Sequence, residues 1–187
     1  RQMCIRDRFV TDNKTNSLYI LPVSDPQKPQ RVDSNLTGVY GLDWYKGSVY
    51  IATQNKIIRY TEIESDGSYK ERNTVIDTIP SPKRGSMNTI AVKNDRILVG
   101  IPANCESCRP KDSRRGSIVS YALDGSDEEL FARGLKSITD ILPVDDTLVV
   151  TDIGRDGIGN NLPQVELNKV EKGKDYGWPV SYTHLRA

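Results

Sequence analysis

Short runs of alternating apolar and polar residues, separated by turn-forming residues, recur along most of this chain. The segment VYGLDWYKGSVYIATQNKIIRYT, residues 39–61, predicts three strands, with breaks at Lys46-Gly47 and around Asn55. The same order of strand, turn and strand returns twice further along the chain. The three repeats occupy 39–61, 88–102 continued by 116–125, and 138–152 continued by 163–170.

The repeats have a regular length. Their middle strands begin near Val49, Ile97 and Leu148, at spacings of 48 and 51 residues, and the strand-like segment 9–21 precedes them as the remainder of another repeat. No window of a dozen residues has helical spacing, and 127–135 would form one helical turn at most. A period near fifty, with three or four strands per unit and no helices, predicts an all-β fold of the β-propeller type. A sandwich of short antiparallel strands is the alternative.

Two long insertions each follow a middle strand. The first, PANCESCRPKDSRRG, covers 102–116, and the second begins at Asp152 in TDIGRDGIGNNLP. In a propeller such insertions gather on one face, where a ligand can lie over the central channel. Read as an EF-hand from Asp152, the second insertion has Gly154 and Pro163 where calcium ligands should stand, so that motif is excluded. A ligand loop and a solvated turn remain as alternatives.

Composition excludes several classes of function. The chain has 187 residues, of which 36% are hydrophobic and 27% charged, as in a globular domain. Lys and Arg total 26 against 25 acidic residues, so no strong field favours nucleic acid or anionic lipid as a partner. The apolar runs, such as RILVGI, are too short to span a bilayer.

The two ends differ in character from the repeats. Residues 1–7 and 181–187 resemble translated sequencing-adapter sequence and are set aside from fold reasoning, which leaves 8–180 as a partial propeller domain. Cys4 and the only histidine, His184, are set aside with them. We expect the rest to be a fragment of about three blades of a larger propeller.

Cys105 and Cys108 form a lone Cys-x-x-Cys in the first insertion. A zinc site would need a second pair or a histidine, and a thioredoxin-type motif would need a strand followed by a helix. The spacing therefore favours a small local disulfide, typical of a periplasmic or extracellular protein, with two reduced thiols as the alternative.

These residues carry a family resemblance. ANCESCRPKDSRRGSIVSYALDGSDEELFARGL, 103–135, and VVTDIGRDGIGNNLPQVELNKVEKGKDYGWP, 149–179, resemble the soluble glucose/sorbosone dehydrogenases, and the sorbosone dehydrogenase branch is the nearer match. These are six-bladed propellers that use pyrroloquinoline quinone (PQQ) and calcium. The resemblance covers nearly all of 9–180 and about half of a full propeller. It implies an exported enzyme that oxidises an aldose or a sugar aldehyde by hydride transfer to PQQ.

The resemblance also assigns roles to individual positions. Gly85 and Ser86 stand where the family has its catalytic histidine, the general base for the sugar hydroxyl. Lys136 and Ser137 occupy the places of an Arg-Asn pair that contacts the quinone; lysine keeps the charge of arginine and loses its planar fork. A catalytically degraded propeller, acting as a ligand- or protein-binding module, is therefore the alternative function.

The calcium sites of the family are held partly by backbone carbonyls, which tolerate changes of side chain. The resemblance implies that the carbonyls of Gly154 and Arg155 face a cofactor-side calcium ion. The carbonyls of Glu166 and Tyr176 match ligands of a structural calcium ion.

Overall fold

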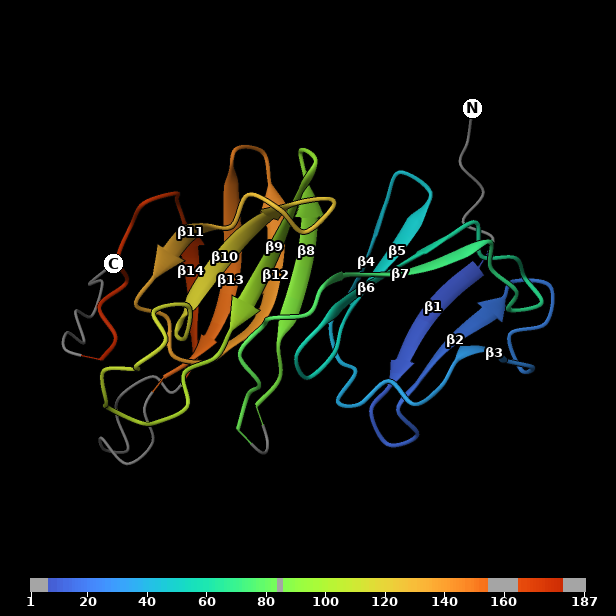
Figure 1. Ribbon diagram of the computed structural model, residues 1–187, viewed down its shortest axis with the longest axis horizontal. Helices are drawn as coiled ribbons and strands as arrows, with labels where there is room; N and C mark the ends of the chain where they lie inside the picture. Colours follow the sequence, from blue (N-terminus) through green and yellow to red (C-terminus); the bar gives the residue numbers. More distant parts are fainter. Residues whose placement is uncertain (1–6, 84–85, 155–164, 180–187) are drawn as a thin grey trace.

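The chain forms fourteen strands and no helix over the residues that the computed structural model describes, 7–83, 86–154 and 165–179. The strands make four antiparallel sheets that follow one another along the chain (Figure 1). Each sheet is a meander, in which consecutive strands pair with each other. No helix that could cross a membrane occurs in these ranges.

The first sheet contains β1 (Asp7–Asp12), β2 (Ser17–Pro22) and β3 (Gln30–Asp33), and the second contains β4 (Leu42–Tyr45), β5 (Ser48–Ala52), β6 (Ile57–Thr61) and β7 (Glu71–Ile76). The third contains β8 (Thr89–Lys93), β9 (Arg96–Ile101), β10 (Ser117–Ala122) and β11 (Glu129–Arg133). The fourth contains β12 (Ile138–Val144), β13 (Thr147–Ile153) and β14 (Val165–Val170).

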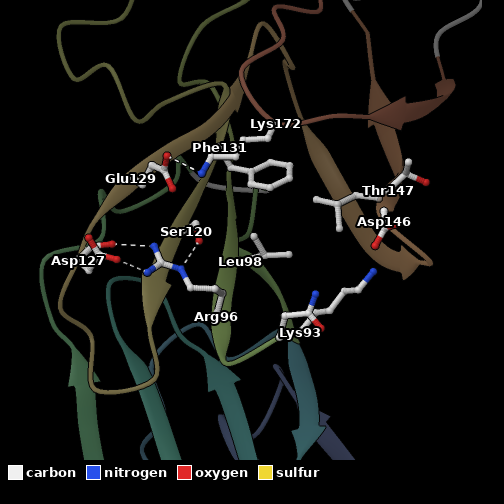
Figure 2. Close-up of a pocket in the computed structure, with 12 residues that line it drawn as sticks. Lys93, Arg96, Leu98, Ser120, Asp127, Glu129, Phe131, Asp146, Thr147 and Lys172 are labelled. Atoms are coloured by element: carbon white, nitrogen blue, oxygen red, sulfur yellow. Dashed lines mark hydrogen bonds and ion pairs between the residues drawn. The ribbon is translucent and has the colours of Figure 1, made fainter.

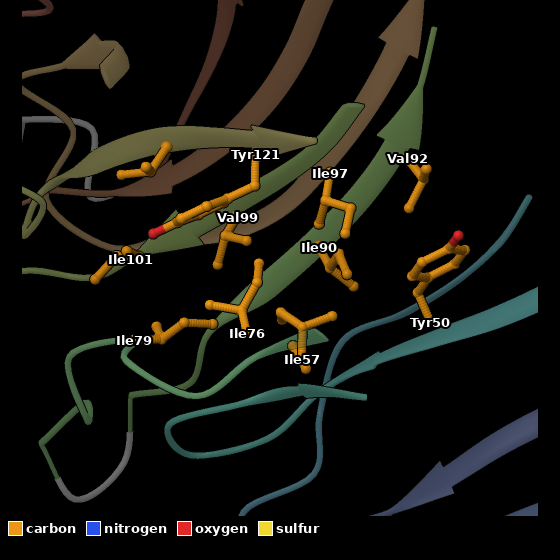
Figure 3. Packing of buried hydrophobic residues seen from close by; sticks show 12 residues of the cluster. Tyr50, Ile57, Ile76, Ile79, Ile90, Val92, Ile97, Val99, Ile101 and Tyr121 are labelled. Atoms are coloured by element: carbon orange, nitrogen blue, oxygen red, sulfur yellow. The ribbon is translucent and has the colours of Figure 1, made fainter. Parts of the chain in front are cut away.

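The hydrophobic core lies between consecutive sheets. Between the second and third sheets, Ile57 and Ile76 pack with Ile97, Val99 and Ile101 (Figure 3). One similar cluster joins the first sheet to the second, and another joins the third to the fourth. The first strands of the last three sheets, β4, β8 and β12, contact one another in that order. Four sheets packed in succession, the last three with contacting first strands, form a partial propeller, which confirms the predicted all-β fold class.

The predicted repeat agrees with the middle strands, because Val49, Ile97 and Leu148 fall in β5, β9 and β13. Each repeat was predicted to contain three strands, and the outer strands β7 and β11 were not predicted. Four of the six residues of β7 are exposed, so the strand shows no apolar alternation. The segment 127–135 contains β11 in place of a helical turn. Asp7, which the sequence analysis assigned to a foreign tail, is the first residue of β1.

A carboxylate also joins the first two sheets. Asp33, at the end of β3, accepts hydrogen bonds from the Tyr60 hydroxyl at 2.5 Å and from the Arg72 guanidinium at 2.7 Å. Burial disfavours the charged form of Asp33, but these two bonds, together with the Ser34 amide and the charge of Arg72, hold the pKa of Asp33 below its ordinary value. The polar contact therefore supplements the apolar packing between these sheets.

Candidate functional site

A buried lysine lies where the chain passes from the third sheet to the fourth. Lys136 follows β11 and precedes β12, and only 8% of its surface is exposed. Its backbone carbonyl accepts a hydrogen bond from the amide of Ala103 at 2.7 Å, while the amide of Leu135 donates to the carbonyl of Gly116. Both ends of the 102–116 insertion are thus fixed to the segment that carries Lys136.

The ammonium group of Lys136 has two oxygen partners. Nζ donates to the backbone carbonyl of Gly154 at 2.8 Å and lies 2.7 Å from a carboxylate oxygen of Glu106. The lysine side chain is 10% exposed, whereas that of Glu106 is 53% exposed. The positive charge therefore lies inside the protein, and one of its two partners lies at the surface.

Asp152 fixes the backbone on both sides of the lysine. Its two carboxylate oxygens accept hydrogen bonds from the amides of Lys136, at 2.9 Å, and Ser137, at 2.5 Å. The amide of Ile153 donates to the carbonyl of Ser137 at 3.0 Å. Burial raises the pKa of Asp152 to about 6, a shift that the two amide bonds and the charge of Lys136 oppose and the charge of Glu166 adds to. Asp152 is therefore ionised above about pH 6 and adds a second negative charge beside the lysine.

A disulfide within its loop and a distant tryptophan hold the backbone of Glu106 in place. Glu106 lies between Cys105 and Cys108, which are joined by a disulfide. The indole Nε1 of Trp178 donates to the backbone carbonyl of Glu106 at 3.0 Å, and the amide of Trp178 donates to the carbonyl of Gly134. We call Lys136, Glu106, Asp152 and Gly154 the lysine cluster. It joins the 102–116 loop, β13 and the start of β12.

The structure brings together three of the residues to which the resemblance assigns cofactor or calcium contacts. Lys136 contacts Gly154 through its side chain, and Ser137 contacts Asp152 through its backbone. Arg155 lies outside the described residues. The cofactor and metal roles of these positions stay predictions.

The two carbonyls matched to a structural calcium ion belong to different parts of the fold. Glu166 lies on β14 and pairs with Asp152 in the fourth sheet. Tyr176 lies beyond β14, in a segment that runs along the third sheet, where its amide donates to the carbonyl of Arg133. The hydroxyl of Tyr176 donates to the carbonyl of Lys169 at 2.9 Å. Their role as metal ligands also stays a prediction.

The position matched to the catalytic histidine borders a separate pocket. Ser86 lines a hollow of about 330 Å³, and its amide donates to the carbonyl of Lys83. The other described residues of this lining are Asn13, Gly38, Gln54, Pro82, Lys83 and Met87. Lys83 is the only titratable group among these described lining residues. Gly85 lies outside the described residues.

Sequence reasoning did not identify Glu106 or the role of Asp152. A signal for Asp152 was present, because Leu148, Val150 and Asp152 alternate on the buried face of β13. A carboxylate at a buried strand position requires hydrogen-bond donors nearby. Glu106 gave no such signal, since its direction depends on Trp178, which lies 72 residues further along the chain.

A second pocket lies at the end of the third and fourth sheets that is opposite to the lysine cluster. It measures about 420 Å³ and has Leu98 and Phe131 in its lining (Figure 2). The guanidinium of Arg96 is paired with Asp127, and Lys172 lies 2.8 Å from Glu129. These paired charges compensate each other, so the pocket shows no excess of one sign at these four residues. No pattern in the sequence predicted this pocket.

Comparisons with known proteins place the fold. No family model matches the chain. A protein of Borreliella burgdorferi described as uncharacterized is 22% identical over 183 residues, which cover 90% of this chain and 48% of that protein. The chain thus spans about half the length of this relative.

Solved structures share the fold at low sequence identity. The iodide structure of a Trichoderma reesei carbohydrate-active enzyme of family AA12 matches 93% of this chain and 55% of its own, with a TM-score of 0.69 and 17% identity. The PQQ domain of pyranose dehydrogenase from Coprinopsis cinerea matches 90% of this chain and 48% of its own, with a TM-score of 0.63 and 9% identity. The chain therefore has the fold of a PQQ-type propeller domain, over about half of such a domain.

The lysine cluster does not fit a calcium ion as it stands. The Gly154 carbonyl already accepts a bond from an ammonium, and a divalent ion about 4 Å from that charge would be repelled by about 8 kcal/mol at an effective dielectric constant near 20. Within 7–83, 86–154 and 165–179, no three His, Cys, Asp or Glu side chains come together to hold a metal. The Lys136 ammonium is likewise paired with Glu106, so it does not fit a direct contact with a quinone. No reaction step is assigned to these residues.

Proposed function

We propose that the protein to which this chain belongs is a sugar-dehydrogenase-like propeller of the sorbosone dehydrogenase type, acting on an aldose or a sugar aldehyde. The observation that carries this proposal is the fold shared with the PQQ domain of a pyranose dehydrogenase and with a carbohydrate-active enzyme. PQQ, when bound, would accept the hydride from the sugar. The remaining blades would supply the quinone contacts that Lys136 does not make.

An oxidising location, periplasmic or extracellular, belongs to the same proposal. It is supported by the disulfide between Cys105 and Cys108, since such bonds persist in exported proteins and are rare in the cytosol. Labelling the cysteines of the protein extracted directly from cells under thiol-blocking conditions would test it. Two free thiols in the extracted protein would contradict it.

A second candidate is a propeller that binds a ligand or a protein without turnover. It is favoured by the lysine cluster, whose ammonium is already paired with Glu106 and with the Gly154 carbonyl. It is also supported by the pocket beside Ser86, which has only Lys83 as a titratable group among its described lining residues. Such a protein would keep the ligand face of the fold and lose the catalytic groups.

One experiment separates the two candidates. The whole protein is incubated with PQQ and calcium, and dye reduction is followed with a panel of aldoses and sugar aldehydes. PQQ-dependent dye reduction would support the dehydrogenase, and calorimetric binding of PQQ or sugar without dye reduction would support the binding module. If the whole protein neither reduces the dye nor binds PQQ or a sugar, the dehydrogenase and the binding of these ligands are both refuted, and only a protein-binding module is left.

A further inference from the structure

Among the described residues, oxygens from two segments meet at the Lys136 ammonium at the loop end of the third and fourth sheets. The Lys136 ammonium joins a carbonyl at the end of β13 to a carboxylate in the 102–116 loop. Asp152 adds a nearby carboxylate that holds the backbone amide of the same lysine. A neutral carbonyl and a carboxylate about one cation are the kinds of oxygen donor that calcium takes in proteins.

The distances identify which cation these oxygens are arranged for. The oxygens of Gly154 and Glu106 lie 2.8 Å and 2.7 Å from Nζ. These are lengths of charge-assisted N–H···O bonds, and they exceed the roughly 2.3–2.6 Å of a calcium–oxygen bond. The cluster is therefore built about an ammonium.

We propose that the Lys136 ammonium takes the place of a bound metal ion at this end of the propeller. The ammonium is covalently attached to the chain, so the loops would keep their positions without calcium. The charge would also repel a metal ion from the same oxygens. This inference concerns which cation holds the loops, and it is independent of whether the protein is a dehydrogenase.

Terbium luminescence tests the proposal on the full chain. Terbium binds to calcium-type oxygen sites, and its emission is sensitised by a nearby indole. Trp178 supplies one, because its ring nitrogen contacts the Glu106 carbonyl. Three variants are compared with the wild type: Lys136→Ala, which leaves room for a hydrated ion, Lys136→Met, which fills that room without a charge, and Lys136→Arg, which restores a cation.

Only Lys136→Ala should gain terbium emission. This emission should fall by at least tenfold when Glu106→Gln is added, and it should be lost when Trp178→Phe is added. Calcium should compete for the new site. A wild-type protein that already binds terbium with Glu106-dependent emission would overturn the proposal. A folded Lys136→Ala protein that gains no emission would overturn it as well.

A second measurement decides the question if Lys136→Ala fails to fold. In protein labelled with nitrogen-15 at lysine, a buried and hydrogen-bonded ammonium exchanges its protons slowly enough to be seen by NMR, and Lys136→Arg identifies the signal. The proposal predicts a Lys136 signal that millimolar calcium leaves unchanged. Loss or displacement of this signal by calcium would show that the metal competes for the same oxygens and would contradict the proposal.

Discussion

Removing either partner of the Lys136–Glu106 pair should destabilise the chain, and the two losses should differ. The lysine side chain is 10% exposed and that of Glu106 is 53% exposed. Glu106→Ala removes the carboxylate partner of the buried ammonium, which then keeps its bond to the neutral Gly154 carbonyl. Lys136→Met leaves a half-exposed carboxylate that water can solvate. The first change should therefore cost more, although it removes the residue nearer to the surface.

The expected magnitudes follow from these two environments. An uncompensated buried charge costs about 3–5 kcal/mol, and the lower end applies here because one hydrogen bond remains. Lys136→Met loses the bonds to both Gly154 and Glu106, at about 1.5 kcal/mol each, but it also removes the buried charge, which offsets about half of that loss and leaves a net cost of about 1.5 kcal/mol. For a chain of this length, each kcal/mol lowers the Tm by about 2–4 °C. We expect a decrease of about 6–12 °C for Glu106→Ala and about 3–6 °C for Lys136→Met.

Thermal and urea unfolding of the two single variants and the double variant measure this difference. The double variant should be less destabilised than the sum of the single variants, because it leaves no buried ammonium without a carboxylate beside it. Asp146→Ala, an exposed change at the other end of the fourth sheet, is the matched control and should shift the Tm by little. Equal losses for the two single variants, or strictly additive losses, would refute the reasoning.

Further predictions concern the framework around the site. Gly125 has a φ of +86°, and a Cβ there would lie 1.7 Å from a backbone oxygen, whereas a Cβ at Gly47, with a φ of +81°, would meet nothing within 4 Å. Urea unfolding should therefore show a loss of about 3 kcal/mol or more for Gly125→Ala and about 1 kcal/mol for Gly47→Ala. The pKa of Asp33 is lower in the folded protein than in the unfolded chain, where it is near 4, so ionised Asp33 stabilises the fold above about pH 4. This stability is lost as the pH falls through the pKa of the folded state. The difference in unfolding free energy between wild type and Asp33→Asn should therefore shrink below about pH 4. Replacing both Cys105 and Cys108 by alanine should cost about 2 kcal/mol and reduce the effect of Glu106→Ala, and full additivity of the two changes would contradict the link between them.

The architecture could be predicted because the repeat leaves a strong pattern. Strands β5 and β9 are buried almost throughout, so their apolar residues mark each sheet at a period near fifty. The outer strand β7 has polar and exposed residues and pairs mainly through its backbone, which sequence patterning does not reveal. The number of strands in each sheet was therefore the part that the sequence left undetermined.

The site could be predicted only in part, for a different reason. The family resemblance named Lys136 and Gly154 separately, but the bond between them joins residues 18 positions apart and depends on the register of β12 against β13. Glu106 enters the site because a disulfide and a distant indole hold its loop. These contacts belong to the folded structure, and no local pattern of residues encodes them.

Anomalous diffraction from crystals of the full chain soaked in terbium would test most directly whether Lys136 holds this end of the propeller in place of a metal ion. The expected result for the wild type is no anomalous peak between Gly154 and Glu106, with continuous density for the lysine side chain reaching both oxygens. Lys136→Ala crystals should show a peak in that place. A peak in wild-type crystals, with the lysine displaced from Gly154, would contradict the assignment.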